Sequence, residues 1–333
     1  MKLDAFLTTL HLADAASTAR SLEDAGFHGL WVAETQVDAL LPLAIAAVNT
    51  RRLRLGTGIA IAFARSPMVT AMDAWAIQRA SGGRVDLGLG TQVRAHIERR
   101  FSIPYARPAA RMREYVLALR HIWEAFQHEH PLRFQGEFYR FDLLTPFFDP
   151  GPIEHPRIAV HVAAVNARMF RVAGEVADGV VAHPFHTAAY LRDAALPALR
   201  RGLERGGGDR ASFTVASPVF ALVGKEDEPY ARQQLSFYAS TPTYRPVLET
   251  HGWSGIGEEL SRLAKAGRFN ELPRLVTDEM LDAFVTYGRD YDDLGTRLRD
   301  RYTGLLDRIG LYEGAALKAR PMDVEALRRS LAG

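Results

Sequence analysis

Short apolar runs alternate along the chain with longer segments in which apolar residues recur every three or four positions. The apolar runs cover residues 2–8, 29–34, 53–59, 84–90, 157–164, 178–184, 213–224 and 308–312. The periodic segments predict helices over 14–27, 41–49, 70–81, 111–126, 168–177 and 190–205, with Asp14 as the cap of the first. Strands that are apolar nearly throughout are typical of a parallel sheet that helices cover.

The number of strand–helix units separates two parallel architectures. A doubly wound open sheet uses about five to seven strands, whereas a closed (β/α)8 barrel uses eight and about 250 residues. Eight candidate strands in 333 residues favour the barrel, as a single domain over 1–333. The surplus length lies in two insertions, at about 128–157 and 227–300, and alternation around Gly136 predicts a small hairpin in the first.

Composition excludes several classes of protein. The net charge is only +2, so charge gives no argument for nucleic acid or an anionic membrane as partner. Cysteine is absent, which excludes disulfides, thiolate metal sites and a cysteine nucleophile. No signal peptide and no apolar run of membrane-spanning length is visible, so we expect a cytoplasmic protein.

Two glycine turns follow apolar runs, Gly56-Thr57-Gly58 and Gly88-Leu89-Gly90. A dinucleotide fingerprint needs glycine or alanine at the sixth position, where these turns have Ile61 and Val93. The turns are therefore interpreted as neighbouring strand ends of a barrel. Either they let a flat ring or a phosphate approach the backbone, or they only make tight turns.

Five motifs in order carry a resemblance to a known family: "GFHGLWVAE", "LRLGTGI", "SGGRVDLGLG", "RPAARMREYV" and "AGEVADGVVAHPF". The chain resembles the bacterial luciferase-like flavin and deazaflavin oxidoreductases, especially the branch that uses coenzyme F420, a deazaflavin. The resemblance implies a (β/α)8 barrel in which the cofactor ring lies across the carboxyl ends of the strands. It also implies a cis peptide bond between Gly58 and Ile59, at the end of the third strand.

The resemblance further implies a set of cofactor-binding positions. A helix capped by Asn166 would hold the cofactor phosphate at its N-terminus, and the turn after the fourth strand would reach the same group. Gly174 and Glu175 match positions near the cofactor, although helix–strand packing is an equal alternative for both. The full set is Thr57, Gly58, Ile59, Gly90, Thr91, Gln92, Val93, Ala163, Ala164, Val165, Asn166, Gly174 and Glu175.

Three residues are candidates for acid–base chemistry: Glu34, His96 and His183, each just beyond a strand. Each has a plain alternative: a salt-bridged glutamate, a solvated helix residue and a buried histidine. Some deazaflavin members of the family have a histidine after the strand-two acid, where this chain has Thr35. Arg94 as an anion binder and His11 as an acid–base group are further candidates.

The segment 237–253 is rich in aromatic residues and lies in the longer insertion, where barrels often carry a lid. Tyr244, Arg245, His251 and Trp253 are candidates for the substrate pocket, and an ordinary packed excursion is the alternative.

The predicted function is F420-dependent hydride transfer to or from a small organic substrate, by a homodimer that binds no nucleic acid or membrane. An FMN-dependent monooxygenase is the alternative within the fold, and a non-catalytic binding barrel is the alternative outside enzymes. A hydrolytic barrel would need a metal. The pairs His128/His130 and His183/His186 lack a third ligand at metal-binding spacing, so no metal site is predicted.

Overall fold

Eight parallel strands close into a barrel in the computed structural model, which describes residues 1–312 and 322–333. Going round the barrel, they are β1 (Lys2–Leu7), β2 (Gly29–Val32), β3 (Arg54–Thr57), β5 (Val85–Gly90), β8 (Ala159–Ala164), β9 (Gly179–Ala182), β10 (Thr214–Val219) and β13 (Arg308–Leu311). Pairing of β3 with β5 and of β13 with β1 closes the ring. The predicted (β/α)8 barrel is therefore confirmed, with all eight strands at the predicted places.

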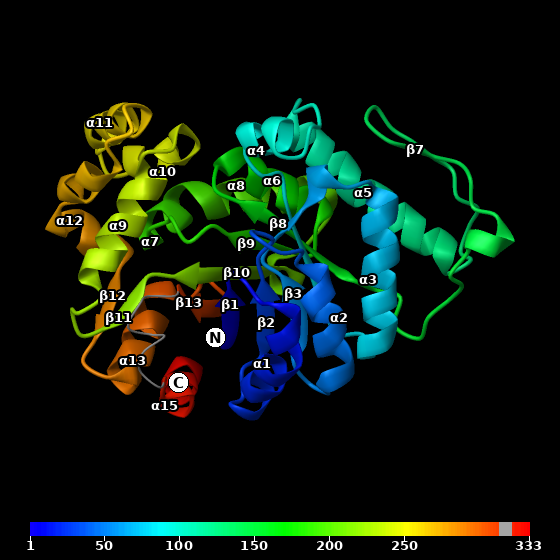
Figure 1. The fold of residues 1–333 in the computed structure, drawn as a ribbon, viewed down its shortest axis with the longest axis horizontal. Coiled ribbons are helices and arrows are strands. Elements are labelled where there is room, and N and C mark those ends of the chain that lie inside the picture. The colour runs from blue at the N-terminus through cyan, green and yellow to red at the C-terminus, as the bar shows by residue number, and fades with distance from the viewer. Residues whose placement is uncertain (313–321) are drawn as a thin grey trace.

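Helices surround the barrel, as Figure 1 shows. They are α1 (Leu12–Asp24), α2 (Leu40–Asn49), α3 (Pro67–Ser81), α4 (Arg94–Arg99), α5 (Pro108–Phe126), α6 (Ala167–Val176), α7 (Ala188–Tyr190), α8 (Leu196–Gly206), α13 (Tyr291–Tyr302) and α15 (Val324–Ala332). The predicted cap of the first helix is wrong: His11 holds the extended N-cap position, and Asp14 lies in the first turn. A carboxylate there still favours the helix because it faces the positive end of the dipole.

The helix predicted over 190–205 is not continuous. A π-helical turn at Leu191–Ala195 joins α7 to α8, and Pro197 lies in the first turn of α8. Proline has no N–H to donate to the preceding turn, so it is best tolerated where a helix begins.

Both insertions have structure of their own. The first contains the predicted hairpin, β6 (Phe134–Gln135) with β7 (Arg140–Phe141), and the carboxylate of Glu114 on α5 accepts hydrogen bonds from three successive backbone N–H groups of its turn. The second contains α9 (Glu228–Ala239), α10 (Arg245–Glu249), α11 (Ser254–Lys265), α12 (Asp278–Phe284) and β12 (Thr286–Gly288). Strand β12 pairs in parallel with β11 (Ala221–Val223), and this whole insertion lies at one side of the barrel (Figure 1).

Charged side chains fill the base of the barrel interior. Arg308 donates through Nε to Asp4 Oδ2 and through Nη1 to Asp86 Oδ2, both at 2.6 Å, and all three residues are buried. Asp4 also accepts from Trp31 Nε1 at 2.7 Å. The buried carboxylates are thus paired with a buried cation, as the cost of desolvating an isolated charge requires.

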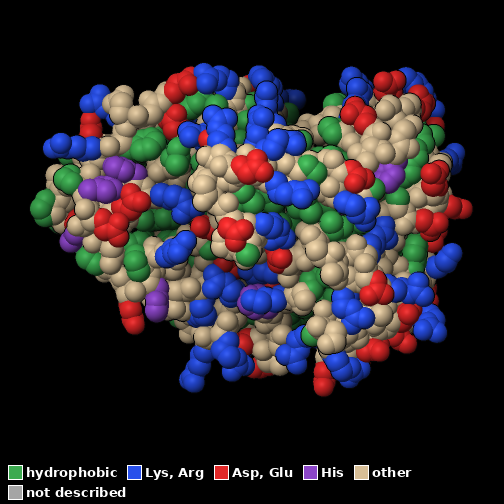
Figure 2. All heavy atoms as spheres, turned by 180° about the vertical axis from the view of Figure 1, so that it is seen from behind, with side chains coloured by type: hydrophobic (Ala, Val, Ile, Leu, Met, Phe, Trp, Pro, Cys, Tyr) green, Lys and Arg blue, Asp and Glu red, His purple; other side chains and the backbone are tan. Residues whose placement is uncertain are grey.

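The outer surface carries both signs of charge. Lys and Arg side chains are interspersed with Asp and Glu over the face seen in Figure 2. No helix in the described ranges combines the length and apolar character that crossing a bilayer needs.

Candidate active site

An apolar floor lies inside the barrel, above its charged base. Trp31, Val181 and Ala216 form a buried cluster, and the partly exposed Phe6 and Ile59 pack against it. The rings of Phe6 and Trp31 stack with their centroids 5.5 Å apart. Phe6 and Ile59 leave this cluster partly exposed, and an apolar surface inside the barrel suits a planar ring system.

The bond between Gly58 and Ile59 is a cis peptide, as the family resemblance implies. The structure also answers why glycine recurs on the next strand. A Cβ at Gly88 would overlap the carbonyl oxygen of Thr57, and one at Gly90 would lie 2.5 Å from Ile59 Cδ1. These two glycines therefore make room for the backbone and side chain at the end of β3, a role that the sequence analysis did not consider.

The turn after β5 begins helix α4. Gln92 has a positive φ of 55°, and its side-chain oxygen accepts a hydrogen bond from Val93 N at 2.9 Å. Thr91 and Gln92 are half-buried. The turn thus lies at the carboxyl end of the barrel, next to β8, where the sequence predicts cofactor contacts.

Helix α6 begins at the same end of the barrel. The side chain of Asn166 accepts a hydrogen bond from Met169 N at 3.1 Å, which confirms it as the N-cap. Ala163 and Ala164 end β8, and the carbonyl of Val165 accepts from the Tyr190 hydroxyl at 2.7 Å. The first N–H groups of a helix have no partner within it and attract anions, so this cap region suits a phosphate.

Gly174 and Glu175 pack against neighbouring helices, not against a strand as the packing alternative proposed. A Cβ at Gly174 would run into the backbone of Leu199 and Leu203 on α8. Glu175 pairs with Arg113 at 2.7 Å and with Arg205 at 3.4 Å. Because both residues serve the contact between helices, we leave them out of the cofactor site proposed below.

Glu34 is held by an arginine that the sequence analysis missed. Arg65 donates to both carboxylate oxygens, at 2.6 and 3.0 Å, and its Nη2 also pairs with Asp38 at 2.5 Å. Glu34 Oε2 accepts from Ile61 N at 2.7 Å as well. A carboxylate so occupied is suited to fixing the backbone after β3 rather than to donating a proton. In the sequence, only the position of Arg65 shortly after the glycine turn could have indicated this role.

The two candidate histidines differ in environment. His96 lies on α4 and is exposed. His183 follows β9 and is partly buried; its Nδ1 accepts from Phe185 N at 3.1 Å, and burial lowers its pKa to about 3. His183 is therefore neutral at physiological pH. Arg94 pairs with Glu98 along the same exposed helix as His96, and His11 is exposed at the start of α1.

Tyr244, one of the residues predicted for the substrate pocket, lies at the mouth of the barrel. The ring of Tyr244 stacks on His183 at 4.7 Å, and its hydroxyl lies 3.3 Å from His183 Nε2. His251 instead bonds Thr187 at 2.8 Å and stacks on Trp253, as in a packed excursion. His251 and Trp253 thus follow the packing alternative, and Tyr244 stays a prediction for the substrate pocket.

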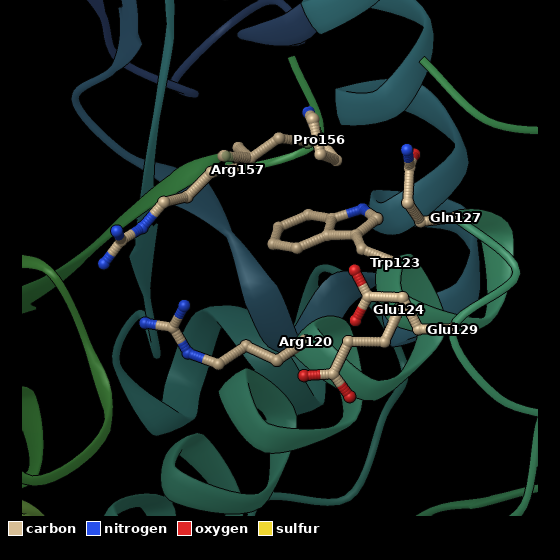
Figure 3. Close-up of a pocket in the computed structure, with 8 residues that line it drawn as sticks. Arg120, Trp123, Glu124, Gln127, Glu129, Pro156 and Arg157 are labelled. Carbon is tan, nitrogen blue, oxygen red and sulfur yellow. The ribbon is translucent and has the colours of Figure 1, made fainter. Parts of the chain in front are cut away.

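A cavity of about 320 Å³ lies at the other end of the barrel, beside α5 and the residues that precede β8. Figure 3 shows the indole of Trp123 within it, with the guanidinium groups of Arg120 and Arg157 on one side. Arg120 is bound to the carbonyl of Val176 and to Asp178. None of the predicted cofactor-binding residues lines this cavity, so we do not assign the cofactor to it.

His130, which belongs to one of the histidine pairs not predicted to bind a metal, lies close to two further side chains that could be metal ligands. His121, Glu124 and His130 bring their ligand atoms within 4.8 Å of one another. His121 Nε2 accepts from Arg133 N at 3.2 Å, so the neutral ring carries its proton on Nδ1, the atom that faces Glu124 at 4.0 Å. That nitrogen has no free lone pair for a metal, and we assign no ion to the group.

Comparison with known proteins finds relatives that align over most of the chain. The chain is 47% identical over 315 residues to the uncharacterized protein Rv1360 of Mycobacterium tuberculosis, covering 93% of this chain and 92% of that one. It is 29% identical over 290 residues to a 5,10-methylenetetrahydromethanopterin reductase of Archaeoglobus fulgidus, covering 84% and 82%.

Solved structures share the fold. The coenzyme F420-dependent tetrahydromethanopterin reductase of Methanopyrus kandleri superposes with a TM-score of 0.77 at 21% identity, covering 98% of this chain and 96% of that one. The oxygenating constituent of 3,6-diketocamphane monooxygenase from a Pseudomonas putida plasmid, in complex with FMN, gives a TM-score of 0.67 at 15% identity over 99% of both chains. The profile of the luciferase-like monooxygenase family matches residues 2–308, and this chain therefore belongs to that family.

Proposed function

We propose that this protein binds coenzyme F420 across the carboxyl ends of the barrel strands and transfers a hydride between it and a small organic substrate. The observation that carries the proposal is the pairing of the apolar floor, partly exposed at Phe6 and Ile59, with the Asn166-capped start of α6. The first suits the planar ring, and the second suits the phosphate. The likeness to the F420-dependent reductase of Methanopyrus kandleri supports the deazaflavin.

The cofactor supplies the hydride chemistry, and the protein supplies position and protons. Thr57, Gly58, Ile59 and Gly90 would lie beneath the ring, while Thr91, Gln92, Val93, Ala163, Ala164, Val165 and Asn166 would reach its side chain and phosphate. Glu34 has a positioning role in this proposal, through Arg65 and Ile61, in place of the predicted catalytic one. His183 remains a candidate for contact with the substrate, and His96 is farther out on an exposed helix face.

An FMN-dependent monooxygenase is the second candidate function, favoured by the FMN-containing neighbour of the same fold. A titration decides between the two. Trp31 lies in the floor, so a bound ring should quench its fluorescence directly. We expect F420 to quench and FMN not to; the reverse result would establish the alternative. Trp31→Phe should lose most of the quenching, while equilibrium dialysis should still detect the bound cofactor.

A second variant tests the phosphate position. Asn166→Asp keeps a good N-cap but places a negative charge beside the expected phosphate. We expect cofactor affinity to fall about tenfold or more while the melting temperature stays near that of the wild type. Unchanged affinity would place the phosphate elsewhere, and failure of both cofactors to bind the wild type would reject the proposed function and leave a binding barrel.

We further propose a cytoplasmic homodimer. Leu41 and Val48 on α2 are 57% and 71% exposed, and Val69 and Met72 on the adjacent α3 are 47% and 53% exposed. Large apolar side chains gathered on one face are typical of a surface that another protein covers. The absence of cysteine is compatible with a reducing compartment.

A further inference from the structure

Four rings meet above the carboxyl ends of β9 and β13. His183 follows β9 and Tyr312 follows β13, while Tyr238 comes from α9 and Tyr244 from the 3₁₀ turn Pro242–Tyr244. His183 lies between two tyrosines, with Tyr244 stacked on it and Tyr238 edge-on, each with ring centroids 4.7 Å away. The longer insertion therefore completes the wall of the barrel mouth on this side.

The hydrogen bonds fix where the proton of His183 lies. Its Nδ1 accepts from the backbone N–H of Phe185 at 3.1 Å, so the neutral imidazole carries its hydrogen on Nε2. That N–H donates to the Tyr244 hydroxyl oxygen at 3.3 Å. The hydrogen of the Tyr244 hydroxyl is therefore not used in this contact.

The hydroxyl hydrogens of the neighbouring Tyr238 and Tyr312 are both engaged in hydrogen bonds. The Tyr312 hydroxyl donates to Gln234 Oε1 at 3.2 Å. The Tyr238 hydroxyl lies 2.6 Å from that of Tyr312 and consequently donates to it. Among the described contacts of this wall, the hydroxyl of Tyr244 is the one whose hydrogen is available to a bound molecule.

The surroundings keep this hydroxyl a neutral donor. Burial, with a smaller effect of Tyr238, raises the pKa of Tyr244 above its ordinary value. The rings of Phe185 and Tyr238 lie 5.8 and 5.9 Å from the Tyr244 ring. A single hydroxyl donor on an aromatic wall matches a neutral molecule with one acceptor oxygen on an apolar body.

We propose that Tyr244 is a catalytic residue whose hydroxyl binds, and then protonates, the oxygen of a neutral aldehyde or ketone. This inference rests on the proposed function, since the reduced deazaflavin is the hydride donor. The hydride adds to the carbonyl carbon, the π electron pair moves to the oxygen, and that oxygen takes the proton of Tyr244. The N–H of His183 holds the resulting phenolate until water returns the proton. Alcohol oxidation runs through the same groups in reverse.

Binding of a matched set of small molecules tests the inference without turnover. Cyclohexanone, cyclohexanol and cyclohexanecarboxylate have similar bodies and differ in the oxygen group, and their affinities can be measured by saturation-transfer NMR. We expect cyclohexanone to bind the wild type and Tyr244→Phe to weaken it about fivefold, as loss of one hydrogen bond does. Tyr238→Phe, whose hydroxyl points to Tyr312, should change the affinity less than about twofold.

Several outcomes would overturn the inference. One is equal affinity of the wild type and Tyr244→Phe for cyclohexanone, and another is that none of the three molecules binds. A third is a preference for the carboxylate, which the adjacent Arg245 would explain because its Nε is buried without a hydrogen-bond partner among the described residues. Nitrogen-15 NMR of labelled histidine supplies the second readout. We expect the proton of His183 on Nε2 in both the wild type and Tyr244→Phe; a proton on Nδ1 would remove the basis of the proposal.

The F420 titration on the same samples separates the two proposals. If F420 binds and cyclohexanone has the same affinity for the wild type and Tyr244→Phe, only the assignment of Tyr244 fails. If F420 does not bind but cyclohexanone binds the wild type more tightly than Tyr244→Phe, the wall recognises a carbonyl and the proposed hydride chemistry fails.

Discussion

At the residue scale, Arg308 is the cation between two buried carboxylates at the base of the barrel. Burial raises the pKa of Asp4, whereas hydrogen bonds and nearby cations hold the pKa of Asp86 well below its ordinary value. Removing Arg308 leaves both groups without this partner. We expect Arg308→Met to lower the free energy of unfolding by about 3–5 kcal/mol in urea denaturation.

The exposed Arg297→Met on α13 is the control for Arg308→Met and should cost less than about 1 kcal/mol. Adding Asp4→Asn to Arg308→Met should recover part of the loss, because one uncompensated carboxylate is removed. An equally small effect of both arginine variants would show that the pair of carboxylates does not depend on Arg308.

The buried residue His186 predicts that the stability of the protein depends on pH. His186 is 3% exposed and bonds Ser217 at 2.9 Å, and burial lowers its pKa to about 3. Below about pH 6.5 the unfolded chain binds a proton that the folded protein does not. Stability therefore falls as pH falls toward 3, by about 1.4 kcal/mol per pH unit for each such histidine.

Urea denaturation at about pH 7, 6 and 5 measures this slope. His186→Gln should reduce the slope by about one histidine's share. A slope that His186→Gln does not alter would mean that His186 takes up its proton in the folded protein.

At the element scale, β5 is shaped to accommodate the end of β3. Alanine at Gly88 would meet the backbone oxygen of Thr57, which cannot move away alone, whereas alanine at Gly90 would meet the end of the Ile59 side chain. We expect Gly88→Ala to be the more destabilising, by about 3 kcal/mol, and Gly90→Ala to cost about 1 kcal/mol. Thermal denaturation checks the order; Gly90→Ala as the worse variant would contradict it.

At the scale of the whole molecule, the exposed apolar face of α2 and α3 predicts assembly. Val48→Glu and Leu41→Glu place charges in that face and should shift a dimer to monomer in sedimentation velocity. Phe269 is 54% exposed in the longer insertion, which lies at another side of the barrel, so Phe269→Glu is the matched control. A wild-type monomer, or a dimer that neither variant disturbs, would refute this interface.

The sequence by itself determined the barrel and much of its mouth. The eight apolar runs became the eight barrel strands, because strands buried on both faces are apolar at most positions. Asn166 was recognisable as a cap because capping depends on residues within one helical turn. The family resemblance placed the cis bond at Gly58 correctly.

The tertiary structure decided which side chains meet. Arg65 holds Glu34 from 31 positions away, and Tyr244 reaches His183 from 61 positions away. For Gly174 the sequence left open a cofactor contact or helix–strand packing, whereas the structure packs it against helix α8. Local periodicity reports the burial of each residue but not its partner, since partners are set by how the elements pack around the barrel.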